Sequence, residues 1–399
     1  MKNNIRLAYI LSFVSELYFP ISIWLFYYLR YLTFSEIGIL TAVKLLSAII
    51  FEVPTGVFAD KVGRKKAIVI SFFLYGLVMF GFAGVSVFWM FIVLDIFKAL
   101  SSAFYSGSME ALVYDTLKEE GQEEHYDKVV ANMESIAWIG LFVSSVLGGF
   151  LYYVWFRSPY LVQGTLYIIS GIIALGLIEP KIDTKKYSWN EVWKGNFSGF
   201  SELFANNKIA QMTVVFVILG AGYFVASELM GISQAREYGM DSRGAGILFG
   251  VGYVVSALFS QFYPVLRKRL GGKNLLYIVA TVLIGSFLVA KWVGIVMGSI
   301  LIVSRISSST TFRNTRSSVI NKLIGSKARA TSISTLVLLS QLPMAIMAYF
   351  LGDYIDKHSP NMLAWLVGWV MIITLVLQWL YFRTRIKYES NNAMVRNTS

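Results

Sequence analysis

Ionisable side chains inside long apolar stretches are the residues of this sequence best placed to do chemistry. Glu16 lies about ten residues into the first such stretch, and Asp95 and Lys98, three positions apart, share a helix face in the fourth. A charge in hydrocarbon costs roughly 3 kcal/mol or more unless it faces a cavity or a partner. Each is therefore a candidate for binding a proton, an ion or a charged substrate. The remaining candidates of this kind are Glu52, Glu110, Arg305, Arg313 and Arg316.

A structural alternative exists for every one of these residues. Each can instead form an ion pair that fixes helix packing, or lie at the wet end of a helix bundle. Asp95 and Lys98 can neutralise each other on their shared face. The structural interpretation is the better one for Lys44, Glu134 and Glu228, because they lie near the ends of their apolar stretches.

Aromatic residues supply the second chemical feature, at 16% of the chain. Rings beside an acid bind an amphipathic cation through cation–π contacts. Rings are equally common at the two membrane interfaces, where they anchor helices. The aromatic residues that we consider as cavity candidates are Tyr18, Trp24, Tyr105, Trp138 and Tyr223.

Other kinds of chemistry have no support in the sequence. Cysteine is absent, which excludes a disulfide, a thiolate nucleophile and a cysteine-based metal site. His125 and His358 are the two histidines, and both fall in polar loops, so a histidine-rich metal site is excluded. No glycine-rich loop ends in Lys-Ser or Lys-Thr, which argues against ATP as an energy source. We expect neither an enzyme nor a cofactor.

The elements that carry these residues are membrane-spanning helices. The 399 residues are 56% hydrophobic and 15% charged, with a mean hydropathy of +0.62, and the apolar residues come in runs of about 20. This is typical of an all-α polytopic membrane protein. We predict twelve spans, at 7–29, 35–59, 67–86, 88–114, 128–153, 159–178, 209–233, 243–266, 274–290, 293–318, 330–351 and 361–382.

The distribution of Lys and Arg predicts the orientation. With the N-terminus in the cytoplasm, the inner loops hold 24 of these cations and the outer loops hold 6. Since cations accumulate in cytoplasmic loops, both termini are expected there. The formal charge of +12 has the same explanation, together with anionic lipid, and needs no nucleic acid partner.

The spans fall into two halves. Residues 1–178 and 209–399 would each form a six-helix bundle, with a short tail after the second, and 179–208 would form a cytoplasmic linker. Within the linker, apolar residues from Trp189 to Phe204 recur at near-helical spacing, which predicts an amphipathic helix in the membrane interface. An ordinary linker with aromatic anchors is the alternative. Similar basic loops after the second and eighth spans favour an internal duplication, which would place Glu110 opposite Arg316.

The loop after the second span carries a family pattern. The segment from Gly56 to Lys65 reads GVFADKVGRK, which matches G-x-x-x-D-x-x-G-R-[KR] at every fixed position. With the twelve spans and the central linker, the chain resembles the major facilitator superfamily. Glu52 and Pro54 extend the pattern to one that is similar to clostridial-type tetracycline exporters and other bacterial efflux proteins.

The resemblance implies a gate built on this loop, whose residues are Gly56, Asp60, Gly63, Arg64, Lys65 and Asp115. Asp60 would cap the cytoplasmic end of the eleventh helix near Ala330 and Thr331, and Arg64 would pair with Asp60 and Asp115. The resemblance also implies that helices one, four, seven and ten line a central cavity. That makes Glu16 the first candidate for binding a proton or a cationic substrate.

One helix departs from the pattern of drug/proton antiporters in this family. Their fifth helix usually carries G-P-x-x-G-G, whereas residues 141–149 here keep Gly148 and Gly149 without the proline. Lys98 lies about where the family often has a coupling arginine in helix four, although the surrounding glycine pattern differs.

The resulting hypothesis is a secondary active transporter that works by alternating access. It would export an amphipathic small molecule or drug, conferring antibiotic resistance, as an antiporter coupled to protons that bind Glu16, Asp95 or Glu110. Uptake of a small metabolite with protons is the alternative, and a receptor or scaffold with a transporter-like fold is a third possibility. We expect a monomer in the bacterial plasma membrane, with a small molecule, protons and the lipid bilayer as partners.

Overall fold

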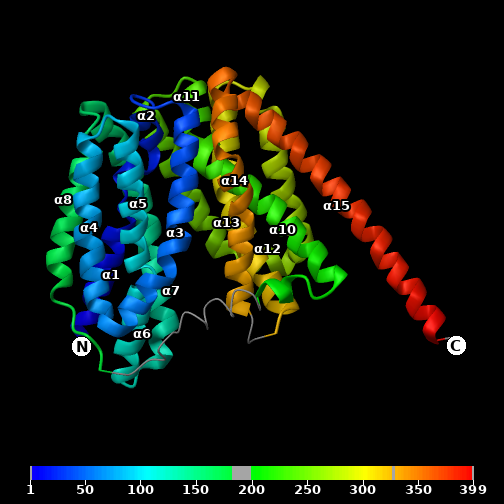
Figure 1. Ribbon diagram of the computed structural model, residues 1–399, viewed down its shortest axis with the longest axis horizontal. Helices are drawn as coiled ribbons and strands as arrows, with labels where there is room; N and C mark the ends of the chain where they lie inside the picture. The colour runs from blue at the N-terminus through cyan, green and yellow to red at the C-terminus, as the bar shows by residue number, and fades with distance from the viewer. Residues whose placement is uncertain (1, 182–198, 326–328, 398–399) are drawn as a thin grey trace. The chain divides into compact units, whose positions relative to one another are not determined.

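The computed structural model describes residues 2–181, 199–325 and 329–397, and its regular elements over these residues are all helices (Figure 1). The first part contains α1 (Lys2–Glu16), η1 (Phe19–Ser22), α2 (Trp24–Tyr28), α3 (Phe34–Val62), α4 (Arg64–Gly84), α5 (Phe88–Tyr105), α6 (Ser108–Glu119), η2 (Glu123–His125), α7 (Tyr126–Val154) and α8 (Ser158–Ala174). The second part contains α10 (Asn207–Val225), η3 (Ala226–Met230), α11 (Gly231–Glu237), α12 (Ser242–Val289), η4 (Ala290–Trp292), α13 (Ile295–Leu323), α14 (Arg329–Lys357) and α15 (Pro360–Asn397).

The prediction of an all-α polytopic membrane protein is confirmed. Ten of the described helical segments are long and apolar enough to cross a membrane. One of them contains α12, which consists of two helices joined at Gly271, where φ is +77°. The 17-residue helix α8 is apolar but shorter. When α12 is counted as two spans and α8 is added, the ten segments account for the twelve predicted crossings.

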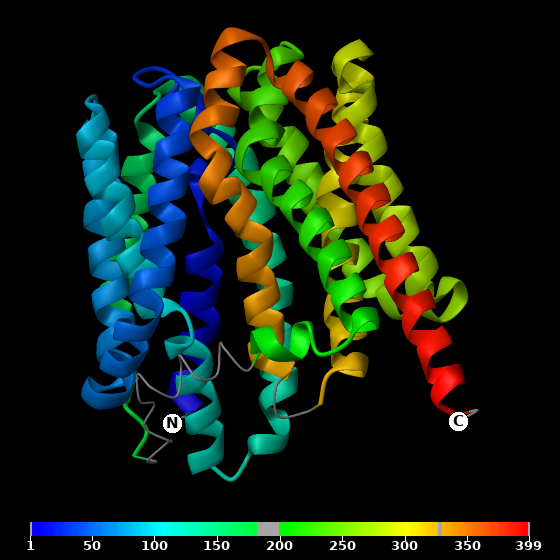
Figure 2. The ribbon, with the colours of Figure 1, turned by 45° about the vertical axis from the view of Figure 1, so that its right-hand side comes forward.

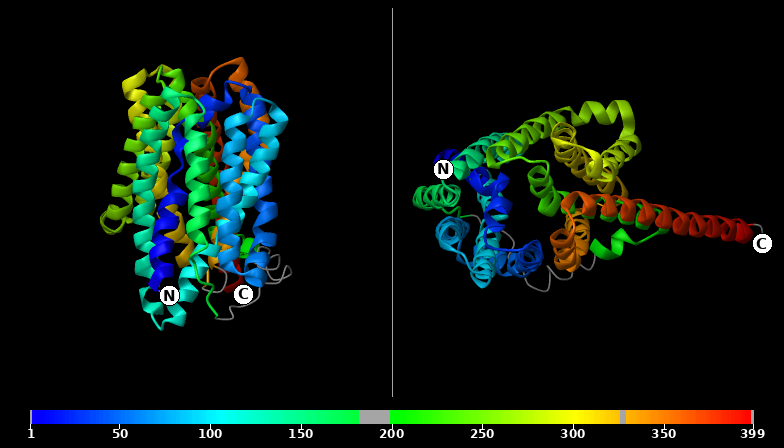
Figure 3. Two further views of the ribbon diagram at one scale, coloured as in Figure 1. Left: turned by 90° about the vertical axis from the view of Figure 1, so that its left-hand side faces the viewer. Right: turned by 90° about the horizontal axis from the view of Figure 1, so that it is seen from above.

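The chain divides into two compact units. The first unit comprises Met1–Trp189, Tyr238–Ala257 and Ala348–Asp356, and the second comprises Asn190–Glu237, Leu258–Met347 and Lys357–Ser399. In the first unit α4 packs against α8 and α5 (Figures 1 and 3). In the second unit α15 lies along α10 (Figure 2). The division into halves at 178 and 209 stays a prediction.

The first predicted span is broken, which corrects the expectation of a continuous helix over 7–29. Helix α1 ends at Glu16, and one turn of 3₁₀ helix follows at Phe19–Ser22 before α2 begins. The cause is Pro20, which has no N–H to donate and disfavours the α conformation at the residue before it. The break falls directly after the acid that the sequence singled out.

Two further spans depart from regular α-helix. The fourth is divided into α5 and α6 at Gly107, whose φ of +72° lies in the left-handed region that favours glycine. The seventh contains the π-helix η3, in which Glu228 lies. Irregular backbone of this kind at membrane depth is tolerated where it is buried in protein or lines a cavity. The first helix of each half thus carries an irregular segment beside an acid.

The linker is described only at its ends. Trp189, Val192, Trp193 and Phe197 lie outside the described residues, so the predicted interfacial helix stays a prediction there. Residues 199–203 form a short helix. It packs against α14 in the second unit, where the Ser332 hydroxyl donates to the Gly199 carbonyl at 3.4 Å.

Segments from both halves of the chain meet inside the first unit. Asp356, at the end of α14, accepts hydrogen bonds from the backbone N–H groups of Phe34 and Ser35 at 2.9 Å each, and from the Ser35 hydroxyl. The start of α12 packs on α7, where Ser145 donates to the Gly246 carbonyl and Ser242 donates to the Gly149 carbonyl, both at 3.0 Å. We call these contacts the α3–α14 and α7–α12 contacts.

Candidate functional site

The broken helix in the first unit presents a carboxyl group beside irregular backbone. Glu16 is half-buried at the last position of α1, and from Tyr18 onward the backbone N–H groups leave the regular helical hydrogen-bond ladder. Discontinuous membrane-spanning helices form the substrate and ion sites of many membrane transporters. The freed groups need partners, because an unsatisfied N–H in an apolar interior costs several kcal/mol.

Two hydrogen bonds connect the broken segment to neighbouring helices, and one of them satisfies a freed backbone N–H. Gln163 of α8 is fully buried, and its carbonyl oxygen accepts from the Phe19 N–H at 2.9 Å. Ser22, also fully buried, donates its hydroxyl to the Ser145 carbonyl of α7 at 2.9 Å. The break is therefore held in one conformation by α7 and α8.

Glycines let α7 approach this break. A Cβ at Gly148 would lie 1.9 Å from the Phe19 carbonyl oxygen, and one at Gly140 would lie 3.3 Å from the Glu16 Cβ. The glycine pair of the fifth predicted span therefore allows close helix packing. Gly148 contacts the broken helix, and Gly149 contacts α12, where a Cβ at Gly149 would lie 2.4 Å from the Ser242 carbonyl oxygen.

A lysine and two tyrosines from other helices contact the end of α1 and the residue Tyr18 that follows it. Lys98 of α5 donates to the Tyr18 hydroxyl at 2.7 Å, and its ammonium lies 4.6 Å from the centre of the Tyr18 ring. Tyr167 donates to the Ser15 carbonyl at 2.9 Å, and the Tyr105 hydroxyl lies 3.5 Å from that of Ser12. We define the Glu16 cluster by five residues, Glu16, Tyr18, Lys98, Tyr105 and Tyr167.

The Glu16 cluster combines the carboxyl group of Glu16, the ammonium group of Lys98 and three tyrosine hydroxyls. Glu16 lies within electrostatic range of Tyr105 and Tyr167. Asp95, one helical turn before Lys98, is 4% exposed and lies within range of Tyr28 and Tyr160. This arrangement can bind a cation on rings and carboxylate together, or exchange a proton at the carboxyl group.

The other candidates of the first unit lie elsewhere. Glu52 and Glu110 are exposed on α3 and α6. Trp24 packs edge-on against Tyr28 with ring centres 5.4 Å apart, and Trp138 is half-buried on α7. These four residues do not join the contacts that define the Glu16 cluster.

The second unit contains a buried polar chain around Arg305. Arg305 is 4% exposed and donates to the Gln234 side chain, whose amide nitrogen donates to Asn361 at 2.9 Å. The Asn361 N–H in turn donates to Glu237 at 2.8 Å. The chain ties α13 and α11 to the start of α15.

The remaining candidates of the second unit are separate from that chain. Tyr223 is 7% exposed and donates to the Val279 carbonyl at 2.9 Å, which fixes α10 against α12. Arg313 is exposed on α13. Arg316 is buried with its guanidinium 5.7 Å from the Phe312 ring centre. Because Glu110 and Arg316 fall in different units, their pairing stays a prediction.

The loop motif forms a compact charge cluster in the first unit. Arg64 Nε lies 3.2 Å from Asp115, and its Nη2 lies 3.8 Å from Asp60. Glu179 accepts from the N–H groups of Arg64 and Lys65 at 2.7 and 2.8 Å and so caps the start of α4. Gly63 has a φ of +119°, and a Cβ there would lie 2.9 Å from Glu179. This accounts for the motif's second glycine.

Replacing Arg64 with Gln should destabilise the first unit. It would leave the Asp115 side chain, 4% exposed, without its cation, and breaking a buried ion pair costs about 3 kcal/mol. The thermal unfolding midpoint of the purified protein in detergent should fall. Lys61→Gln, at an exposed cation of the same loop, should leave it unchanged.

A second variant separates this coupling from a general loss of packing. Arg64→Gln combined with Asp115→Asn removes both charges and should recover much of the loss. Losses that simply add in the double variant would show that the two residues do not stabilise each other.

Known proteins resemble this chain in sequence. A model of the Major Facilitator Superfamily matches residues 6–348. The uncharacterized MFS-type transporter YxaM of Bacillus subtilis is 26% identical over 243 residues, covering 58% of each chain. MJ1560 of Methanocaldococcus jannaschii, another uncharacterized MFS-type transporter, is 24% identical over 317 residues, covering 75% of this chain and 72% of that one. The quinolone resistance protein NorA of Staphylococcus aureus is 25% identical over 240 residues, again 58% of each. The chain thus matches little more than half the length of YxaM and NorA.

Solved structures resemble the whole chain. The nucleoside transporter NupG superposes with a TM-score of 0.81 at 15% identity, covering 95% of this chain and 99% of that one. A bacterial homologue of the human lysosomal transporter Spinster superposes with a TM-score of 0.69 at 15% identity, covering 96% of each chain. At this identity the likeness shows the fold.

Proposed function

The chain belongs to the Major Facilitator Superfamily and is a multi-pass membrane transporter, and from that premise we propose that it exports an amphipathic cation in exchange for protons. The observation that carries the proposal is the position of Glu16. Its carboxyl group ends α1 at a break in the membrane-spanning backbone, next to the Lys98–Tyr18 pair and the tyrosines of the Glu16 cluster.

Competition for one carboxylate gives the coupling. A protonated Glu16 is neutral and has no attraction for a cation, whereas the ionised form binds a cation together with the neighbouring rings. Binding of the substrate then requires that the proton leave, and rebinding of the proton releases the substrate.

The direction of transport rests on two weaker supports. Glu52 and Pro54 extend the loop motif in the manner of bacterial efflux proteins. NorA, similar over part of the chain, is a quinolone resistance protein. Uptake of a small polar metabolite is the second candidate, since the fold is also that of the nucleoside transporter NupG.

A growth screen separates the two directions. Cells that express the protein should tolerate higher concentrations of lipophilic cations and quinolones than cells that express Glu16→Gln. Unchanged tolerance across the panel, together with faster growth of an auxotroph on an added nucleoside or other metabolite, would overturn export in favour of uptake.

Alternating access would use contacts at the two ends of the bundle. We assign the α3–α14 and α7–α12 contacts to the outer side, on the basis of the predicted orientation. The Arg64–Asp115 cluster belongs to the inner side, where Asp60 would cap the eleventh helix near Ala330 and Thr331. Close backbone packing supports an outer closure, since a Cβ at Gly38 would lie 2.2 Å from the Ala348 carbonyl and one at Gly352 would lie 2.1 Å from that of Phe34.

Asp356→Ala should favour opening of the outer side. It leaves the Thr33 capping box of α3 in place but removes the carboxylate that accepts from the N–H groups of Phe34 and Ser35. A side-chain acceptor at a helix start contributes about 1 kcal/mol, which shifts the equilibrium about fivefold. The chain contains no cysteine, so Ser145→Cys, fully buried at the α7–α12 contact, reports opening through its labelling by a membrane-impermeant thiol reagent. Labelling should be about fivefold faster when Asp356→Ala is added to Ser145→Cys.

Asp127 offers a matched control. It is also an exposed acid in the first turn of a helix, but it lies at the start of α7, 18 residues and thus about 27 Å before Ser145. Asp127→Ala should leave the labelling rate of the Ser145→Cys thiol unchanged. Equal acceleration by both variants would contradict an outer latch at Asp356.

A further inference from the structure

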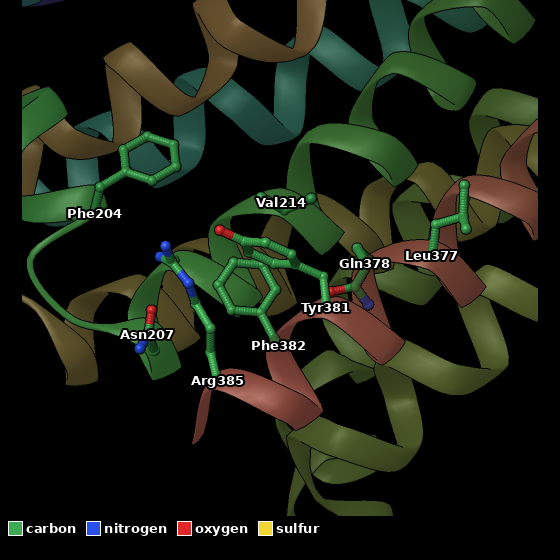
Figure 4. Close-up of a pocket in the computed structure, with 9 residues that line it drawn as sticks. Phe204, Asn207, Val214, Leu377, Gln378, Tyr381, Phe382 and Arg385 are labelled. Carbon is green, nitrogen blue, oxygen red and sulfur yellow. The ribbon is translucent and has the colours of Figure 1, made fainter. Parts of the chain in front are cut away.

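A groove in the second unit lies away from every candidate described above. It has a volume of about 590 Å³ and lies between the start of α10 and the last described side chains of α15. Its lining residues are Phe204, Asn207, Ala210, Val214, Leu377, Gln378, Tyr381, Phe382 and Arg385. Figure 4 shows the Arg385 guanidinium turned toward Asn207, with the Tyr381 and Phe382 rings beside it.

The groove lies where two membrane spans end. The apolar span of α10 begins at Asn207, and that of α15 ends at Arg385. These two helices are antiparallel neighbours, so their ends lie on the same side of the membrane. Val214 and Leu377 lie further into the spans. The groove therefore runs from the membrane interface into the depth of the acyl chains.

The groove is polar at the membrane interface and apolar toward the acyl chains. Arg385 is the charged residue that lines the groove. The exposed cations Lys208 and Arg383 follow lining residues directly in the sequence, and the acid Glu202 lies two residues before Phe204. An arginine fork binds a phosphate through paired charge-assisted hydrogen bonds. The Gln378 side-chain oxygen is buried and has no hydrogen-bond partner among the described residues, which calls for a hydroxyl donor. Val214, Leu377 and Ala210 offer an apolar wall below.

We propose that this groove binds one anionic phospholipid of the phosphatidylglycerol type. The phosphate would lie on Arg385, the headgroup glycerol would donate to Gln378, and one acyl chain would follow α10 and α15 along Val214 and Leu377. The proposal does not depend on the transported substrate or on its direction. A free phosphate would use the Arg385 end alone and would leave the apolar wall without a role.

Lipid retention by the purified full-length protein tests this proposal. Native mass spectrometry in detergent would be recorded during titration with phosphatidylglycerol and, separately, with zwitterionic phosphatidylcholine. We expect one phosphatidylglycerol to be retained per protein in preference to phosphatidylcholine. Arg385→Gln should reduce that retention about tenfold, because the charge-assisted hydrogen bonds between the guanidinium and the lipid phosphate are lost.

Arg383→Gln is the matched control, because it removes the same charge two residues away. Arg383 is exposed, with its guanidinium 4.9 Å from the Trp379 ring centre, and does not line the groove. Because it makes no hydrogen bond to the phosphate in the groove, its loss should change retention less than about twofold. Val214→Trp, which narrows the groove without altering charge, should also lower retention, with the thermal midpoint reporting that the variant is folded. Equal losses in the two arginine variants, or full retention in Arg385→Gln, would overturn the proposal.

Discussion

Glu16→Gln should abolish proton-coupled transport while leaving the protein folded and able to bind its substrate weakly. The amide has the size of the carboxyl group but cannot release a proton, so binding of a cation is no longer linked to proton exchange. The substrate uptake that an imposed proton gradient drives should fall to the level seen in vesicles without protein. Exchange of labelled for unlabelled substrate, which needs no net proton movement, should persist at reduced affinity.

The control uses another acid of the same unit. Glu134 is exposed on α7 and lies outside the Glu16 cluster. Glu134→Gln makes the same chemical change and should retain gradient-driven transport. If Glu16→Gln transports against a gradient as fast as the unmodified protein does, Glu16 has no part in coupling, and Asp95 becomes the next acid to test.

Gly148→Ala should cause the largest structural loss in the chain. A Cβ at this position would lie 1.9 Å from the Phe19 carbonyl oxygen, which belongs to backbone that cannot give way without moving the broken helix. Overpacking of this kind costs about 3 kcal/mol. The midpoint of thermal unfolding should fall, and the geometry at Glu16 should be lost with it.

Gly285→Ala is the matched substitution in the second unit. Gly285 is also helical, and nothing lies within 4 Å of the position its Cβ would occupy. Alanine favours a helix by about 1 kcal/mol over glycine, so this variant should be as stable as the unmodified protein or more so. A Gly148→Ala variant with unchanged stability would show that α7 does not hold the break.

The sequence predicted the helices well because each apolar run is long enough to be recognised alone. It missed the break after Glu16, although Pro20 was a local signal for it, because the apolar residues continue across the break. The kink at Gly107 was missed because a positive φ at a glycine is invisible in hydropathy, whereas the break at Gly271 falls in the loop predicted between the spans 243–266 and 274–290.

The candidate site was predicted only in part. Glu16, Tyr18 and Lys98 were expected as separate candidates, and the structure brings them together. Gln163 was missed because an uncharged amide in an apolar run gives little warning, although its burial signals a role. Charged candidates such as Glu110 proved to be exposed, because a helix bundle exposes some faces and no pattern in one chain distinguishes them.

Residues that act on distant backbone were the hardest to predict. Glu179 caps α4 and Asp356 caps α3, each across more than a hundred positions of sequence. A carboxylate at a helix start binds whichever N–H groups the fold brings to it, so the partner depends on tertiary structure.

Proton movement in reconstituted vesicles tests the central claim most directly. Purified protein in vesicles with an acidic lumen and an entrapped pH dye would receive ethidium, a lipophilic cation, from outside. Antiport predicts that ethidium accumulates and that the lumen becomes more alkaline, with neither change in Glu16→Gln. Ethidium uptake without any change in luminal pH, or an equal pH change in Glu16→Gln, would contradict the proposal that Glu16 exchanges a proton for the exported cation.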